Sequence, residues 1–177
     1  MLSLGSKADA LIPALSLRLN PVSLLHGGLN TTFDFDLSRH WSVGPSLAYF
    51  QSRVDSRGAF LTDFNVKSRA LGGRATWHSR GILNNGFYLA TTVQHTFARV
   101  VTKDLFGPLS GQASTVLLGA YAGHTWLWKD WSLMLGLGYR RPLTPSEIHV
   151  TSSLDAQVGR ASQSSGIHAE LFMGWRI

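Results

Sequence analysis

The sequence predicts an all-β fold, an eight-stranded antiparallel up-and-down transmembrane β-barrel, and three observations support this prediction. Apolar and polar residues alternate in segment after segment, which is typical of strands with two different faces. No apolar run approaches the roughly 20 residues that a membrane-spanning helix needs, so a membrane protein of this sequence has to span as a barrel. Finally, the tryptophans all lie beside predicted short turns or the C-terminus.

The clearest stretch is a hairpin over residues 112–143. With Lys129 and Asp130 as a two-residue turn, Trp128 faces Trp131 and fixes the register of both strands. One face of this hairpin is then apolar. The other face carries small and polar residues such as Gly119, which suit a wet interior better than the core of a two-layer soluble protein.

The other six strands are expected where alternation recurs, over residues 11–20, 29–37, 41–49, 65–77, 86–102 and 166–177. Pro45 cannot donate a backbone hydrogen bond, so we expect a bulge or an unpaired position there. Short turns connect the strands at the tryptophan end.

The opposite end of the barrel is expected to carry a turn region at residues 20–28 and three longer loops, 55–64, 104–111 and 144–165. Residues 1–177 are read as one domain, with a tail over about residues 1–10. Residues 144–165 are read as a long, mobile extracellular loop.

The composition of the chain excludes several classes of function. The 177 residues include no cysteine, which excludes disulfides and thiolate metal sites. The net charge of +6 is spread without a dense basic run or a nucleic-acid-binding motif, so no nucleic acid partner is expected. The first residues do not form a signal peptide, and we expect that one has been removed.

In strand number, loop asymmetry, tryptophan placement and an alternating last strand, the chain resembles the small eight-stranded outer-membrane barrels of Gram-negative bacteria, the OmpA-barrel and OmpX-like group. Members usually end in Phe or Trp, where Trp175 and Ile177 stand here. The resemblance implies a monomeric barrel in the bacterial outer membrane, in contact with its lipid and lipopolysaccharide. It also implies a function in the outer loops, where a protein partner could bind, or in a lipid-modifying site. No cofactor is expected.

Three sets of residues follow from the expected phase of the strands. A membrane-interface girdle is predicted because indole rings favour the boundary between headgroups and hydrocarbon: Trp41, Trp77, Trp126, Trp128, Trp131 and Trp175. Basic residues in the long-loop half are candidates for contact with lipopolysaccharide phosphates, or are ordinary solvated charges: Arg53, Arg57, Lys67, Arg69, Arg99, Lys103 and Arg141. The third set is an interior charge network: Arg18, Asp34, Asp36, Arg74, His78, Arg140, Glu170 and Arg176.

Within the interior network, Glu170 is expected at the height of Arg18 and Arg140, as a carboxylate between two guanidiniums that plugs the lumen. Such a network is either a gate or proton-linked switch, or a structural feature whose charges are all satisfied. The second interpretation is favoured, because an eight-stranded barrel is just wide enough for side chains to fill.

No catalytic residues and no metal site are predicted. Lipid A deacylases built on small barrels carry a His-x-Ser-Asn signature, and neither His78 nor His149 stands in one. His95 and His124 fall on the lipid face, where an imidazole is awkward. His95 therefore marks either a bulge that reverses the phase of the strand or a genuine site, and the bulge is the favoured interpretation.

The sequence therefore predicts a non-enzymatic outer-membrane barrel that acts as an envelope-structural, surface-binding or anchoring protein with a non-porin interior. One alternative is a lipid A or phospholipid hydrolase. A second alternative is a soluble, lipocalin-like ligand carrier, which would need its apolar face turned inward.

Overall fold

The computed structural model describes residues 15–25, 27–55, 63–104, 107–144, 146–151, 156–161 and 165–177. Side chains are described for residues 15–25, 27–51, 65–101, 110–144 and 165–177. The expected N-terminal tail lies outside the described residues.

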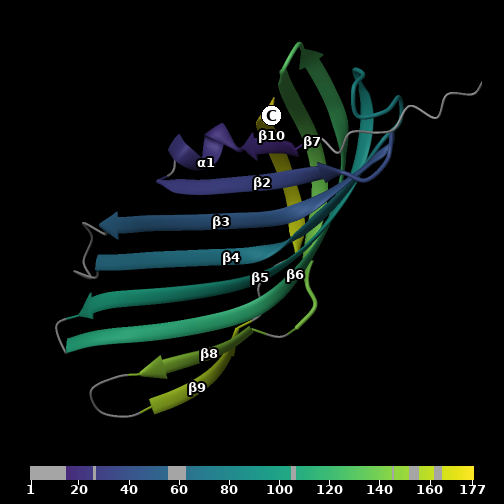
Figure 1. Ribbon diagram of the computed structural model, residues 1–177. Coiled ribbons are helices and arrows are strands. Elements are labelled where there is room, and N and C mark those ends of the chain that lie inside the picture. Colours follow the sequence, from purple (N-terminus) through teal and green to yellow (C-terminus); the bar gives the residue numbers. More distant parts are fainter. Residues whose placement is uncertain are drawn as a thin grey trace, which may run out of the picture.

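Eight strands close into an antiparallel barrel, as the sequence predicts (Figure 1). Neighbours along the chain pair with each other, and closure comes from the pairing of β1 with β10 and of β7 with β10. The barrel strands are β1 (Leu15–Leu19), β2 (Gly28–Asp36), β3 (Trp41–Asp55), β4 (Asp63–His78), β5 (Gly86–Asp104), β6 (Gly107–Trp128), β7 (Trp131–Pro142) and β10 (Gly166–Arg176).

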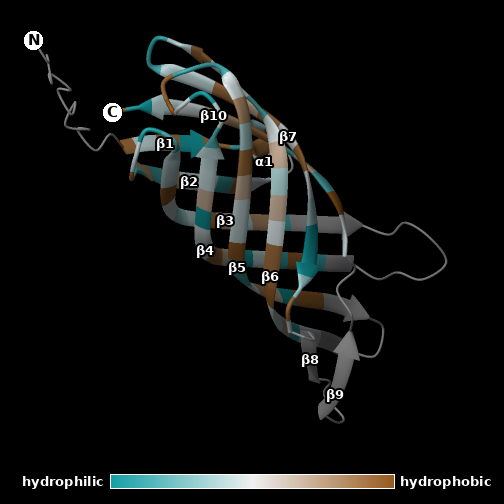
Figure 2. Cartoon of the chain, turned by 90° about the vertical axis from the view of Figure 1, so that its right-hand side faces the viewer, coloured by the Kyte–Doolittle hydropathy of each residue, from teal (hydrophilic) through white to brown (hydrophobic). Residues whose placement is uncertain are grey.

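Apolar side chains point away from the barrel axis and polar side chains point into it. In β2, for example, Asp34 and Asp36 are buried, whereas Phe35 is exposed, as is Leu37 directly after the strand. Successive residues of a strand face opposite sides, so the alternation in the sequence becomes an apolar outer surface and a polar interior. Figure 2 looks onto β3 to β6, which run side by side with hydrophobic and hydrophilic residues along them.

The hairpin of β6 and β7 has the register that the sequence predicts. Trp128 pairs with Trp131, and Ala122 pairs with Leu137 further along. Lys129 in the turn has a φ of 52°, a left-handed conformation that glycine and asparagine adopt more easily.

An unpaired position lies at Pro45, as expected. The ladder between β2 and β3 pairs Phe35 with Val43 and resumes at Thr32 and Ser46, without the two pairs between them. On its other side, β3 pairs continuously with β4. The interruption therefore lies only on the side of Pro45 that faces β2.

The turn region at residues 20–28 contains a helix that the sequence analysis missed, α1 (Pro21–Leu25). Its first turn is capped by Asn20, whose Oδ1 accepts hydrogen bonds from the backbone amides of Val22 (3.0 Å) and Ser23 (3.3 Å). Pro21 suits the first helical position, where no backbone donor is needed. Asn20 and Pro21, at the start of the expected turn region, therefore cap and begin a helix.

The predicted loop over residues 104–111 is wrong. Strand β5 continues to Asp104 and β6 begins at Gly107, and these two residues are already paired. The two strands therefore form one long hairpin.

The predicted loop over residues 144–165 also contains strands. A hairpin of β8 (Ser146–Thr151) and β9 (Ala156–Ala161) adds to the sheet where β8 pairs with residues 110–114 of β6. Figure 1 shows this hairpin beside β6, at the end of the molecule away from the C-terminus. Strand β3 also continues past Phe50, the partner of the first residue of β2. A sheet therefore projects beyond the closed barrel on one side.

Among the described residues, no helix has the length and apolar character needed to cross a membrane.

Candidate functional site

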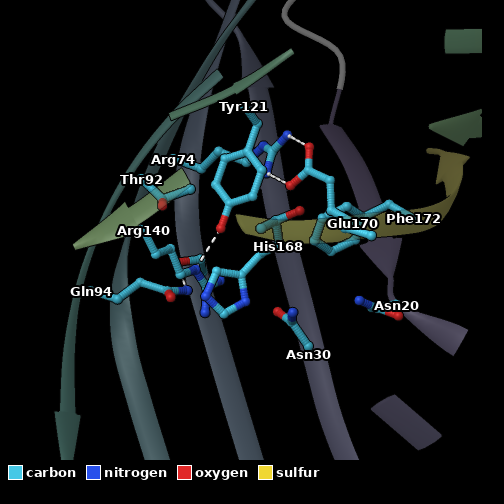
Figure 3. Close-up of a pocket in the computed structure, with 13 residues that line it drawn as sticks. Asn20, Asn30, Arg74, Thr92, Gln94, Tyr121, Arg140, His168, Glu170 and Phe172 are labelled. Atoms are coloured by element: carbon cyan, nitrogen blue, oxygen red, sulfur yellow. Dashed lines mark hydrogen bonds and ion pairs between the residues drawn. The ribbon is translucent and has the colours of Figure 1, made fainter. Parts of the chain in front are cut away.

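The centre of the interior is an ion pair that crosses the lumen from β4 to β10 (Figure 3). The guanidinium of Arg74 donates two hydrogen bonds of 2.8 Å, one to each carboxylate oxygen of Glu170. Both side chains are buried. The hydroxyl of Tyr88 donates a third hydrogen bond to the Glu170 carboxylate, at 2.6 Å. Bidentate geometry with an added donor is the arrangement in which a buried ion pair is best satisfied.

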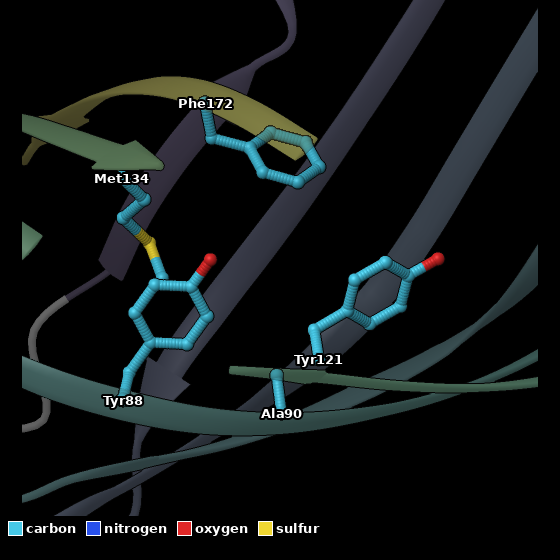
Figure 4. Close-up of a cluster of buried hydrophobic side chains, with 5 residues drawn as sticks. All are labelled: Tyr88, Ala90, Tyr121, Met134 and Phe172. Atoms are coloured by element: carbon cyan, nitrogen blue, oxygen red, sulfur yellow. The ribbon is translucent and has the colours of Figure 1, made fainter. Parts of the chain in front are cut away.

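Aromatic rings surround the guanidinium of Arg74. Its Cζ lies 5.9, 5.7 and 5.2 Å from the ring centroids of Tyr88, Tyr121 and Phe172. The rings belong to a buried cluster that includes Met134 (Figure 4). Cation–π contacts of this kind gain strength where water is excluded. The Arg74–Glu170 pair and these rings, which we call the central plug, fill the middle of the lumen.

Glycines on the neighbouring strands make room for the tyrosines. A Cβ at Gly136 would collide with the Tyr88 hydroxyl, and a Cβ at Gly138 would collide with the Tyr121 ring. The small residues on the inner face of the β6–β7 hairpin therefore do not leave a pore, because aromatic side chains from β5 and β6 occupy the space.

Two more ion pairs link the first, second and last strands of the barrel. Arg18 lies 2.7 Å from the Asp34 carboxylate, with both side chains nearly fully buried. Arg176 lies 3.1 Å from Asp36. Each pair joins adjacent or next-adjacent strands around the closure of β1 with β10.

The expected placement of Glu170 between Arg18 and Arg140 is wrong. Glu170 binds Arg74, whereas Arg18 binds Asp34. The Nε of Arg140 donates instead to the hydroxyl of Tyr121. Counting residues along separate strands gave the wrong height, because strands in a barrel are tilted and staggered relative to each other.

Two cavities lie on either side of the central plug. The cavity toward the long loops has a volume of about 140 Å³ and is lined by Arg140, His168 and Asn30 among others. The cavity toward the tryptophan end has about 330 Å³ and is lined by Arg18, His78 and Arg176 among others. The interior candidates His78 and Arg140 thus face polar cavities and are not part of the Arg74–Glu170 pair.

All six tryptophans lie on the outer side of the strands, near the short turns and the C-terminus. Trp41 pairs with Trp77 across β3 and β4, and Trp131 stacks on Trp175 with ring centroids 5.4 Å apart. Trp126 is half-buried and Trp128 is exposed. These rings form an aromatic zone at one end of the apolar outer surface.

Three of the cationic candidates lie together on the outer surface. Lys67 and Arg99 are direct partners in the β4–β5 ladder, and Arg69 is two residues from Lys67. All three are exposed. Arg141 is exposed on β7, two strands further around the barrel. Arg57 lies outside the described residues, and the side chains of Arg53 and Lys103 lie outside the described side chains.

The expected bulge at His95 is wrong. The register of β5 runs without interruption past His95 on both sides, and the side chain points outward and is exposed. Its Nε2 lies 2.7 Å from the Oγ of Ser114 on β6, and its ring contacts Phe97 at 4.1 Å between centroids. His124 also points outward, between Phe87 and Trp126.

Among the residues whose side chains are described, no group of His, Asp and Glu is arranged to hold a metal ion. The sequence analysis missed Tyr88 and Tyr121 as members of the central plug. Both stand at inward positions of their strands, and each is opposed by glycine across the sheet, Tyr88 by Gly123 and Tyr121 by Gly138. That combination of inward phase and facing glycine is the signal that identifies them.

No protein-family model matches the chain, and no curated protein sequence matches it. Among solved structures, the barrel is similar to the crystal structure of a major outer membrane protein from Thermus thermophilus. The two agree with a TM-score of 0.64 over 93% of this chain and 98% of the other, at 12% sequence identity. At that identity the likeness is one of fold, and the chain has the all-β, closed, eight-stranded antiparallel barrel of that outer membrane protein.

Proposed function

We propose that the protein is an integral outer-membrane barrel that serves as a sealed anchor, structural or surface-binding element of the Gram-negative envelope. The observation that carries this proposal is the direction of the side chains. Phe35, Leu135 and Leu137 on the outer surface are 47%, 50% and 64% exposed, whereas Asp34 and Glu170 are buried inside. Water would penalise so large an apolar surface, and lipid favours it.

The height of the apolar outer surface fits a bilayer. Outward-facing residues of β3 are apolar from Trp41 to Tyr49, and the next outward residue is Gln51. In β4 the apolar run is shorter, from Trp77 to Leu71, because Arg69 follows at the level of Tyr49. A transmembrane strand needs roughly 9 to 11 residues. The tryptophans then form an interfacial girdle at the end that carries the short turns, which faces the periplasm in such barrels.

The central plug favours a sealed barrel rather than a channel. An Arg–Glu pair and three aromatic rings occupy the lumen between two separate cavities. The barrel would then act as a monomer in lipid and lipopolysaccharide, and the projecting part of β3–β6 with β8 and β9 is the surface that a protein partner would meet outside.

The test is fractionation of the outer membrane followed by gel migration with and without heating. A closed barrel resists detergent and migrates faster until it is boiled, so we expect a heat-modifiable band in the outer-membrane fraction. A band in the soluble fraction, with the same migration before and after heating, would overturn the proposal. The same result would favour the lipocalin-like carrier, which the polar, filled lumen argues against.

A lipid hydrolase is the second candidate, favoured by the His95–Ser114 contact on the outer face. At 2.7 Å, the imidazole Nε2 is placed to take the proton of Ser114 as its Oγ attacks the carbonyl of a lipid ester. The imidazolium would return that proton to the leaving alcohol, and water would then release the fatty acid from the serine. The pair lies beside the apolar outer surface, where acyl chains are present.

Mass spectrometry of lipid A and phospholipids after expression separates the two candidates. If the enzyme hypothesis holds, the protein removes an acyl chain and Ser114→Ala and His95→Ala abolish the change. His124→Ala is the matched control, because His124 is another outward-facing histidine with no hydroxyl partner among the described contacts. If acylation is unchanged in the strains that express the wild-type protein and the three variants, the hydrolase hypothesis is wrong and the sealed anchor remains as the proposed function.

A further inference from the structure

An apolar groove on the outer surface lies directly below the cluster of three cations. The groove has a volume of about 300 Å³ and crosses β2 to β5. Its walls are almost wholly hydrocarbon, contributed by Leu29, Leu47, Ala48, Tyr49, Arg69, Ala70, Leu71 and Phe97. On a face in contact with lipid, a groove of this kind would suit an acyl chain.

The cations stand at the end of the groove that is farther from the tryptophans. Arg69 is the groove residue that sits between Tyr49 and Phe97 in the ladders. The next outward pair is Lys67 opposite Arg99. Like charges placed directly opposite each other on a sheet destabilise it, so an anion between these two residues would stabilise both strands.

Each of these residue types binds phosphate well. Arginine offers a planar pair of donors that matches two phosphate oxygens, and lysine adds a point charge. The three ion pairs among the described side chains involve other arginines, at positions 18, 74 and 176. Hydrocarbon walls below and three cations above together match an amphiphile with a phosphorylated headgroup.

We propose that Lys67, Arg69 and Arg99, together with the groove, form a binding site for the lipid A part of lipopolysaccharide, with a phosphate on the cations and an acyl chain in the groove. This proposal rests on membrane residence. The site lies at the end opposite the tryptophans and the C-terminus, which is the outer leaflet in barrels with short periplasmic turns, and lipid A is the phosphorylated lipid of that leaflet. The site therefore favours it over a glycerophospholipid.

The experiment measures binding of purified, folded barrel in detergent to four lipids, namely diphosphorylated lipid A, the same lipid A without phosphate, phosphatidylglycerol and phosphatidylcholine. The test variant is K67Q/R69Q/R99Q. The control variant K129Q/R39Q/R80Q makes the same change in charge at exposed positions of the tryptophan end. Removing charge-assisted hydrogen bonds should weaken binding of diphosphorylated lipid A by roughly tenfold or more, with no change in the control.

A second variant tests the groove. Leu71→Trp fills it without changing charge, and we expect weaker binding of acylated lipid A and unchanged binding of inorganic phosphate. Equal affinity for phosphatidylglycerol and lipid A would overturn the assignment to lipid A, and equal weakening by the control variant would overturn the site. Each variant is also followed through outer-membrane fractionation and the heat-modifiability gel, so a failure of membrane residence or folding is distinguished from a failure of lipid binding in an intact barrel.

Discussion

Glu170 is the residue on which the interior depends. Its carboxylate accepts hydrogen bonds from Arg74 and Tyr88, and Arg74 in turn contacts Thr76 at 3.1 Å and three rings. Loss of one partner of a buried ion pair leaves the other charge without compensation, whereas loss of both partners does not. The central plug therefore predicts a larger loss of stability for the single substitution than for the double one.

We expect Glu170→Leu to lower the free energy of unfolding by about 3 to 5 kcal/mol, because the guanidinium of Arg74 stays buried without a counter-charge. The double variant R74M/E170L should lose much less. Urea unfolding in lipid vesicles, followed by tryptophan fluorescence, measures both. Arg80→Met, at an exposed turn, is the control. A double variant as unstable as the sum of its single variants would contradict the prediction.

The direction of each interior residue could be predicted from the sequence, but its partner could not. The alternation along β2 is enough to place Asp34 and Asp36 inward. The apolar residues of the strand face outward, so the residues that alternate with them face the lumen. The partner of Glu170 lies 96 residues away on the opposite wall. That contact depends on the stagger of all the strands, and no short-range pattern in the sequence encodes the stagger.

At the scale of the strand, the backbones of β2 and β3 approach each other closely at Gly44. A Cβ at this position would collide with the carbonyl oxygen of Phe33 in β2. The neighbouring Gly73, on β4, has no atom closer than 3.9 Å to the position of a Cβ. We therefore expect Gly73 to tolerate a side chain and Gly44 not to tolerate one, which makes the two glycines a matched pair.

Gly44→Ala should lower the free energy of unfolding by about 1 to 3 kcal/mol, as overpacking does, because β2 has to move away from β3. Gly73→Ala should leave it unchanged or raise it slightly, since alanine restricts the unfolded chain. Urea unfolding of the two variants side by side checks this. Similar losses for both would show that the contact at Gly44 is not what requires glycine.

The turn between β6 and β7 allows a stabilising change. Lys129 has a φ of 52°, which costs a non-glycine residue roughly 1 kcal/mol or more. Lys129→Asn should recover part of that cost, and Lys129→Val should add to it, since β-branched residues resist this conformation. The midpoint of urea unfolding reports both. A Lys129→Val variant with a higher urea midpoint would contradict the interpretation that the left-handed conformation of Lys129 is strained.

Strands inside the apolar zone were predictable, whereas strands beyond it were not. The β6–β7 register followed from Trp128 and Trp131, because a two-residue turn between two alternating segments allows one register. The hairpin of β8 and β9 has a weaker contrast, since each strand has only six residues and in β9 the apolar Val158 shares its phase of the alternation with the charged Arg160. A strand with both faces in the same solvent does not need alternating apolar and polar residues. The sequence of residues 144–165 therefore predicts a loop where the structure has β8 and β9.

At the scale of the whole molecule, the central plug separates the two cavities and seals the lumen. We expect no stable conductance from the purified protein in planar bilayers. Replacing Tyr88, Tyr121, Arg74 and Glu170 together with alanine should join the cavities and produce a small conductance. The heat-modifiability gel confirms that the variant has folded. Steady conductance from the unchanged protein would show that the plug does not seal the lumen.

The contact between Arg74 and Glu170 also bears on the order of assembly. The arginine belongs to the fourth strand, and the acid arrives only with the last strand of the chain. A nascent barrel that lacks the last strand would hold Arg74 without Glu170 and Asp36 without Arg176. Arrival of the C-terminal segment would complete the wall and both ion pairs in one event, so an unfinished barrel would carry unpaired interior charges of both signs and be slow to close on itself.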